Sequence, residues 1–129
     1  MIQRVIATVL FVRDRAKCAE FYRDALKMAL LESDEVSNSF RLGDQILILL
    51  EISAAAELLN VDANALKNAG GYRGLLAASV ADVDAAYEEL TAKGVTFLRP
   101  PTDQSWGLRT AHFVDPEGNT WEINQPIAP

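Results

Sequence analysis

One histidine and two carboxylates near the ends of apolar segments are the residues of this chain best suited to chemistry. His112 is the only histidine among 129 residues, and imidazole is the side chain that most readily exchanges a proton near neutral pH. Glu51 and Glu122 each lie toward the end of a segment that is typical of a strand. An imidazole and a carboxylate on one face of a sheet could bind a polar ligand or transfer a proton.

The sequence Asp-Pro-Glu-Gly at residues 115–118 predicts where His112 and Glu122 lie relative to each other. It suits a type I turn followed by a left-handed glycine, between strands predicted at residues 108–114 and 120–124. Such a turn pairs the two residues that flank it, and this register places His112 directly opposite Glu122 on the same face. A register shift of one residue would instead turn His112 toward the helices.

The counts of histidine and cysteine exclude most familiar metal sites. A site that takes two or three imidazoles from one chain cannot be built with His112 alone. The single cysteine, Cys18, excludes an internal disulfide and suits a reducing compartment. We therefore expect no metal and no cofactor, and we interpret Cys18 as an inert thiol in the core.

The charge balance limits the partners. Lys and Arg total 12 and Asp and Glu total 18, so the formal net charge is −6. An acidic chain without a basic cluster is a poor nucleic-acid binder and favours a cationic or hydrogen-bond-donating ligand. The longest apolar stretch, residues 46–50, is too short to span a bilayer. We expect a cytoplasmic protein that binds a small molecule and neither nucleic acid nor membrane.

Two halves of the chain repeat one order of elements, a strand, a helix and three strands. We predict an α+β fold and a single domain at residues 1–129, with a first module at 1–52, a linker at 53–73 and a second module at 74–129. Asp14 and Asp82 are the expected helix N-caps. The predicted strands are residues 5–12, 28–32, 36–42, 45–52, 75–80, 95–98, 108–114 and 120–124, and a loop is predicted from Pro100 to Gly107. In this repeat Glu51 corresponds to Glu122.

Four short motifs, together with this order, resemble one known superfamily. They are Val-Arg-Asp at 12–14, Val-Ala-Asp at 80–82, Asp-Pro-Glu-Gly at 115–118 and Trp-Glu-Ile at 121–123. The chain resembles the vicinal oxygen chelate superfamily, which contains glyoxalase I, extradiol dioxygenases and bleomycin-resistance proteins. The resemblance implies tandem βαβββ modules that form a curled mixed sheet (a cup) with helices outside, usually completed by a homodimer.

The resemblance also implies where a metal would be held. The family's four ligand positions fall on Ala7, Glu51, Leu75 and Glu122. The two positions that are commonly histidine are Ala7 and Leu75 here, and their alkyl side chains have no atom that can bind a metal. The resemblance therefore supports the fold, and the departures argue against metal chemistry. A further departure is Lys27, where family members often carry Gly, and a left-handed backbone there would cost about 1–2 kcal/mol.

Alternation along the first strand of each half predicts a mostly apolar cup. Trp106 could form a platform at its mouth, and Arg109 could pair with an acidic ligand. The expected ligand-binding residues are Ala7, Val9, Phe11, Glu51, Leu75, Trp106, Arg109, His112 and Glu122.

Three functions stay open from the sequence. The leading interpretation is a metal-free protein that binds a small organic ligand in the cup. The first alternative is a glyoxalase-like lyase, isomerase or dioxygenase in which Glu122 acts as the base, with His112 as proton shuttle or with a weak metal held by Glu51, Glu122, water and substrate. The second is a structural or regulatory subunit whose cup is filled by its own side chains.

Overall fold

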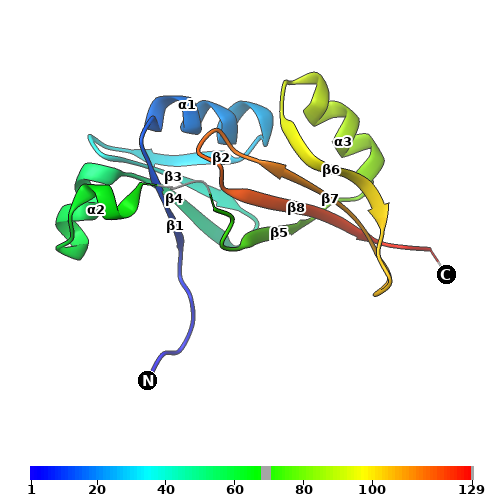
Figure 1. The fold of residues 1–129 in the computed structure, drawn as a ribbon, viewed down its shortest axis with the longest axis horizontal. Helices are drawn as coiled ribbons and strands as arrows, with labels where there is room; N and C mark the ends of the chain where they lie inside the picture. The colour runs from blue at the N-terminus through cyan, green and yellow to red at the C-terminus, as the bar shows by residue number, and fades with distance from the viewer. Residues whose placement is uncertain (68–70, 129) are drawn as a thin grey trace. The chain divides into compact units, whose positions relative to one another are not determined.

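The computed structural model describes residues 1–67 and 71–128, and its chain divides into two compact units, Met1–Ala69 and Gly70–Pro129. Each unit holds one four-stranded sheet and one helix packed on it (Figure 1). The expected α+β fold with a mixed sheet in each half is therefore confirmed. Residues 68–70 of the predicted linker, and residue 129, lie outside the described residues.

The first unit contains the expected strand, helix and three strands, followed by further helical segments. Its strand order is β1-β4-β3-β2, and β1 runs parallel to β4 whereas the other neighbours are antiparallel. The elements are β1 (Thr8–Val12), α1 (Arg15–Glu20), a π-helical turn η1 (Phe21–Ala25), β2 (Ala29–Ser33), β3 (Ser37–Leu42), β4 (Gln45–Glu51), α2 (Ile52–Leu59) and a 3-10 turn η2 (Ala63–Leu66).

Helix α1 begins where Asp14 predicts it and packs on one face of the first sheet. The Asp14 carboxylate accepts a hydrogen bond from the amide of Lys17 at 3.1 Å, which satisfies an N–H group that has no partner within the helix. Cys18 and Tyr22 are fully buried, and the Tyr22 ring lies 6.1 Å from that of Phe40 on β3. The face of the sheet that carries Phe40 is therefore the helix face, and we call the opposite face the distal face.

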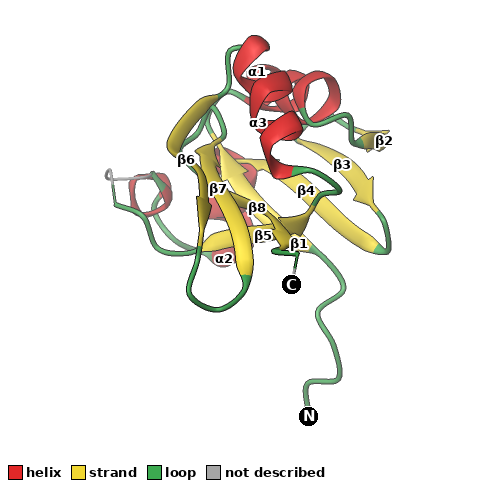
Figure 2. Cartoon of the chain, turned by 90° about the vertical axis from the view of Figure 1, so that its right-hand side faces the viewer, coloured by secondary structure: helices red, strands yellow, loops and turns green. Residues whose placement is uncertain are grey.

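The second unit repeats this arrangement with the strand order β5-β8-β7-β6 (Figure 2). Asp82 caps the helix by accepting from the amide of Ala85 at 3.1 Å. A chain of aromatic rings then joins helix to sheet: Tyr87 contacts Phe97, Phe97 contacts Phe113, and Phe113 stacks on Trp121. These rings define the helix face of the second sheet. The elements are β5 (Leu75–Ser79), α3 (Val83–Ala92), β6 (Thr96–Asp103), β7 (Leu108–Val114) and β8 (Thr120–Pro126).

Two predicted boundaries were wrong. Strand β1 begins at Thr8, so Ala7 precedes the sheet. Strand β6 continues through Pro100 and Pro101 to Asp103, where a loop was predicted. It is an edge strand with irregular register beside these prolines, and such a position tolerates a residue that cannot donate a backbone hydrogen bond. Within the predicted linker lie most of α2, a helix of two turns that begins at Ile52, and the 3-10 turn η2.

Two further features bear on the sequence predictions. Lys27 has φ of 57°, so the backbone at this non-glycine position is left-handed. No helix within residues 1–67 and 71–128 has the length and apolar character needed to cross a bilayer.

Candidate functional site

The hairpin of β7 and β8 has the predicted turn. The buried Asp115 carboxylate accepts hydrogen bonds from the amides of Glu117 and Asn119 at 2.8 and 2.9 Å. The amide of Asp115 in turn donates to the carbonyl of Asn119 at 2.9 Å, and Gly118 is left-handed with φ of 86°. These contacts fix the register of the two strands.

That register brings His112 and Glu122 together as predicted. They are direct partners across the ladder, and His112 Nε2 lies 2.9 Å from Glu122 Oε1. Their side chains are 20% and 15% exposed, so the pair is largely but not completely withdrawn from water. A carboxylate that is hydrogen-bonded to one ring nitrogen fixes the orientation of the imidazole.

The sequence reasoning missed the second partner of Glu122. Asn124 Nδ2 donates to Glu122 Oε2 at 2.7 Å, so both carboxylate oxygens are engaged. Asn124 lies two residues further along the same strand and therefore on the same face, a spacing that could have identified it. Its cross-strand partner is the fully buried Thr110, whose hydroxyl accepts from Gln104 Nε2 at 3.0 Å.

These contacts belong to two rows of residues that cross the distal face of the second sheet. Direct cross-strand partners share a face, with Cβ atoms about 4.5–5.5 Å apart. We call the two rows together the polar face. One row is Arg99, His112, Glu122 and Ala77, and the other is Thr102, Thr110, Asn124 and Ser79.

His112 has one ring nitrogen toward the sheet and one toward solvent. No hydrogen bond joins Nδ1 to the part of the chain described, and no buried side-chain nitrogen or oxygen there lacks a partner. Nδ1 is therefore accessible to water. With Nε2–H donating to Glu122, Nδ1 of a neutral imidazole carries the free lone pair.

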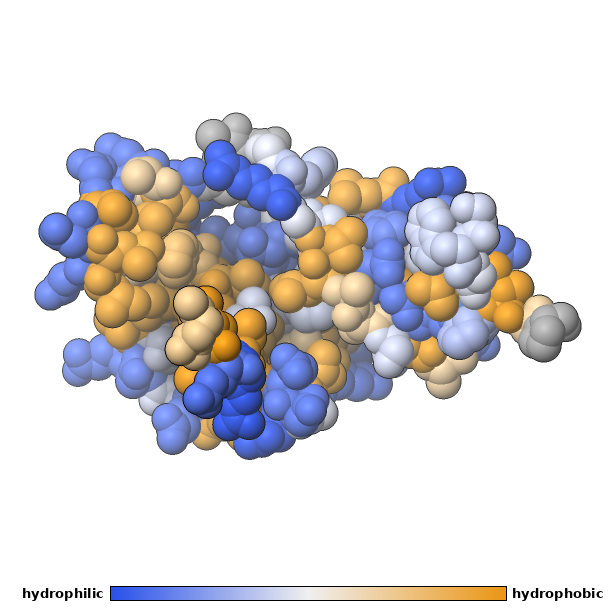
Figure 3. All heavy atoms as spheres, turned by 90° about the horizontal axis from the view of Figure 1, so that it is seen from below, coloured by the Kyte–Doolittle hydropathy of each residue, from blue (hydrophilic) through white to orange (hydrophobic). Residues whose placement is uncertain are grey.

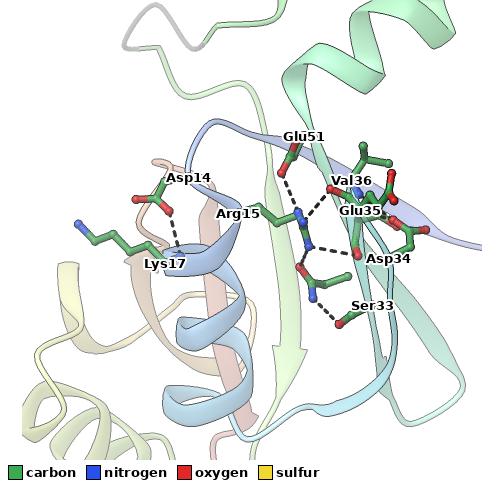
Figure 4. A network of polar contacts seen from close by, with 10 residues as sticks. Asp14, Arg15, Lys17, Ser33, Asp34, Glu35, Val36 and Glu51 are labelled. Carbon is green, nitrogen blue, oxygen red and sulfur yellow. Dashed lines mark hydrogen bonds and ion pairs between the residues drawn. The ribbon is translucent and has the colours of Figure 1, made fainter.

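Glu51 lies on the helix face of the first sheet, not on a distal face. It pairs across the ladder with Val12, which is fully buried in the helix-side core. Its carboxylate accepts from Arg15 Nε at 3.0 Å, at the start of α1 (Figure 4). Val9 and Phe11, in contrast, alternate onto the distal face with Ile48 and Leu50 as partners. Glu51 therefore does not share a face with Val9 and Phe11.

Arg15 is the centre of a network that sequence reasoning did not predict. Its Nη1 donates to Asn38 Oδ1 at 2.9 Å, and its Nη2 donates to the carbonyl of Glu35 at 3.0 Å. Asn38 continues the network by donating to Ser33 Oγ at 2.7 Å (Figure 4). The network ties the first turn of α1 to β2, β3 and β4, which is a structural role.

The strand register also corrects which residues of the two modules correspond to each other. In the second module Glu122 pairs with Ala77, which lies three residues before Val80. The equivalent residue of the first module, three before Val12, is Val9, and it pairs with Ile48. The counterpart of Glu122 in the first module is therefore Ile48. By the same register Glu51 corresponds to Gln125, whose Oε1 accepts from the amide of Val83 at the start of α3. The predicted correspondence of Glu51 with Glu122 was wrong because a short strand match does not define a register.

The residues do not fit the metal that the family's enzymes hold. With the corrected register the four positions are Ala7, Ile48, Leu75 and Glu122. The first three have no side-chain donor atoms, and the Glu122 carboxylate is bonded to His112 and Asn124. Within the described residues no group of three or more His, Cys, Asp or Glu side chains could hold a metal ion.

The remaining predicted ligand residues lie apart from the polar face. Arg109 donates to Asp84 and Asp103 at 2.9 Å each, and its guanidinium holds the pKa of Asp84 below its ordinary value. The two carboxylates also raise the pKa of Arg109. Arg109 is thus already paired. Trp106 lies in the β6–β7 loop and is 66% exposed. Leu75 is half exposed and pairs with Thr120 on the distal face.

Comparison with known proteins defines the class. Residues 4–123 match the model of the glyoxalase/bleomycin resistance protein/dioxygenase superfamily. The chain belongs to this superfamily, as the motifs and the tandem modules indicated.

The chain is also similar to individual known proteins. The chain is 35% identical over 117 residues to the uncharacterized protein YraH of Bacillus subtilis, which covers 88% of this chain and 91% of YraH. It is similar, with a TM-score of 0.83 and 28% identity, to a glyoxalase/bleomycin resistance protein/dioxygenase from Nocardioides, over 98% of this chain and 87% of that one. It is also similar to TnmS3, an antibiotic binding protein from Streptomyces sp. CB03234, with a TM-score of 0.74, 27% identity and 97% of each chain covered.

Proposed function

We propose that this protein binds a small organic ligand on the polar face of its second sheet. The observation that carries the proposal is the His112–Glu122 pair, held at 2.9 Å on a sheet face that its own helix does not cover. A few polar groups at defined positions fix the orientation of the ligand in small-molecule sites. The antibiotic-binding relative TnmS3 supports a binding role within the same fold.

The bonding of Glu122 supports recognition through His112. Because Asn124 and His112 occupy both carboxylate oxygens, Glu122 has limited capacity to accept from a ligand. The accessible Nδ1 of His112 is the stronger acceptor on this face. A ligand that donates an N–H or O–H group would satisfy it.

Thermal-shift measurements with a library of small amphiphiles test the proposal. A ligand that binds the folded state alone raises stability by mass action, about 2.7 kcal/mol at a concentration of 100 Kd. The shift should be lost in His112→Ala and kept in Glu88→Gln, a change on α3 outside the polar face. A library without a single stabilising compound, or binding that persists unchanged in His112→Ala, would contradict the proposal.

A second function, proton transfer, is favoured by the orientation of His112. An imidazole that is held by a carboxylate at one nitrogen and open at the other has the arrangement of a general base. In this role His112 would accept the proton at Nδ1, and Glu122 would position the ring. The sequence-based alternative had Glu122 as the base. We assign that role to His112 instead, because both carboxylate oxygens of Glu122 already accept hydrogen bonds from His112 and Asn124.

Nitrogen-15 NMR and solvent deuterium exchange test this second function. We expect long-range ¹H–¹⁵N spectra to show His112 protonated at Nε2. A bound ligand with an acidic C–H group should exchange that hydrogen with deuterium from solvent, and His112→Asn should stop the exchange. A proton on Nδ1, or exchange that survives the substitution, would contradict the assignment.

A further inference from the structure

Arg99 is the unpaired charge on the polar face. It pairs across the ladder with His112, so the order across β6, β7 and β8 is Arg99, His112, Glu122. Arg99 is exposed and forms no hydrogen bond or ion pair with the residues the structure describes. A guanidinium is always protonated in proteins and presents its donors in a planar fork.

The local backbone holds Arg99 toward the distal face. The register of β6 and β7 shifts between Phe97 and Arg99, so Leu98 and Arg99 together oppose His112. In such a bulge the extra residue re-aims the neighbouring side chain. Pro100 and Pro101 follow directly, and their fixed φ angles limit the freedom of the strand beside the guanidinium.

The other charges near Arg99 are neutralised within the protein. Glu122, the only carboxylate in the two rows of the polar face, has both oxygens bonded to neighbouring side chains. Arg109 lies on the helix face of β7, not on the polar face, and is paired with Asp84 and Asp103. The charge left on this face for an incoming ligand is therefore positive, although the chain as a whole is acidic.

We infer that the ligand is a small monocarboxylate that also carries a hydroxyl or N–H group beside its carboxylate. Arg99 binds the carboxylate through two parallel N–H···O bonds, and His112 Nδ1 accepts from the hydroxyl or N–H. One guanidinium and a nearby Glu122 favour a single negative charge over a dianion such as a phosphate ester. The inference rests on the proposed function and replaces the cationic ligand that net charge favoured.

Three related probes test the inference by NMR titration. Mandelate carries both groups, phenylacetate lacks the hydroxyl, and mandelamide lacks the carboxylate. We expect mandelate to bind most tightly and to shift the amide signals of residues in the two rows of the polar face. Arg99→Gln should raise the Kd of mandelate about tenfold or more, because it removes hydrogen bonds between charged groups. It should leave the Kd of mandelamide unchanged.

Arg41→Gln is the matched control. Arg41 is also an exposed strand arginine without a hydrogen bond or ion pair to the described residues, but it lies in the first module on β3. Its loss should not change mandelate binding. Equal loss of binding in both variants, equal affinity for mandelate and mandelamide, or no binding by any of the three probes would overturn the inference. The library screen with His112→Ala decides the proposed function separately.

Discussion

Lys27 shows how one backbone angle limits the stability of the first module. Its φ of 57° lies in the left-handed region, which costs a residue with a Cβ about 1–2 kcal/mol relative to glycine. Asn60, at the end of α2, has almost the same φ of 56°. Asparagine tolerates this region better because its short side chain can hydrogen-bond locally.

Replacing Lys27 by glycine should therefore stabilise the protein. We expect Lys27→Gly to raise the free energy of unfolding by about 1 kcal/mol, measured by urea denaturation. Asn60→Gly is the matched substitution and should give a smaller gain. A loss of stability in Lys27→Gly would show that contacts of the lysine side chain outweigh the backbone strain.

The Arg15 guanidinium should stabilise the first module through its four acceptors. Its bonds reach Glu51, Asn38 and the carbonyls of Ser37 and Glu35. Hydrogen bonds to charged groups contribute about 1.5–3 kcal/mol when buried, and this side chain is one-fifth exposed.

We expect Arg15→Ala to lower the free energy of unfolding by roughly 1–2 kcal/mol. Arg41→Ala, which removes an exposed arginine from β3, should change it by less than about 0.5 kcal/mol. Urea denaturation of both variants measures the difference. Equal effects of the two substitutions would mean that the Arg15 network adds no stability.

At the scale of elements, sequence patterns predicted what is local. The N-caps Asp14 and Asp82, and the turn at residues 115–118, depend on side chains that bond within four residues, and each was confirmed. Because that turn fixes the register of its hairpin, the His112–Glu122 contact was predictable too.

Contacts between distant residues were not predictable. Glu51 and Arg15 are 36 residues apart, and nothing in their local sequence links them. The face on which Glu51 lies depends on the parallel register of β1 and β4, which no turn fixes. Likewise, Pro100 and Pro101 were read as a loop because their place on an edge strand is a property of the whole sheet.

The turn between β2 and β3 depends on the charge of Asp34. Its Oδ1 accepts from the amides of Val36 and Ser37 at 2.8 and 2.7 Å. These backbone hydrogen bonds, first that of Val36, lower the pKa of Asp34 below its ordinary value of 3.8. The unfolded chain therefore binds this proton more readily than the folded chain.

Stability from Asp34 is consequently present above pH 3.8 and is lost as the pH falls through the lower folded-state pKa. We expect the difference in unfolding free energy between wild type and Asp34→Asn to be constant above this window and to decline within it. Urea titrations at a series of pH values measure the difference. A difference that does not vary with pH would contradict the role of the charge.

At the scale of the whole molecule, we propose that exposed apolar residues of the first unit take part in the homodimer that the superfamily resemblance implied. Met1, Ile2, Val5 and Ile6 precede β1 and are exposed. Leu58, at the end of α2, is exposed as well, and Figure 3 shows hydrophobic residues gathered where α2 lies. Contiguous exposed apolar patches mark interaction surfaces.

We therefore expect a dimer in solution. Light scattering coupled to size exclusion should give about twice the chain mass of 14.1 kDa. Leu58→Glu should shift the equilibrium toward the monomer if α2 takes part, and removal of residues 1–6 should do so if the N-terminal segment takes part. A monomer at high micromolar concentration would contradict the prediction.

The side chains available as metal ligands determine how metal ions should affect the stability of this protein. Cation sites need several oxygen, nitrogen or sulfur ligands that converge, and the described residues contain no such group of three acidic, histidine or cysteine side chains. We expect Ni²⁺, Zn²⁺, Mn²⁺ and Fe²⁺ to leave the melting temperature unchanged within error, and a chelator to have no effect. Glu122→Ala should not alter this response, although it removes the partner of His112. Stoichiometric metal after purification without chelators, lost in Glu122→Ala, would show that water and ligand complete a site around this carboxylate. It would then favour the enzymatic alternative over metal-free binding.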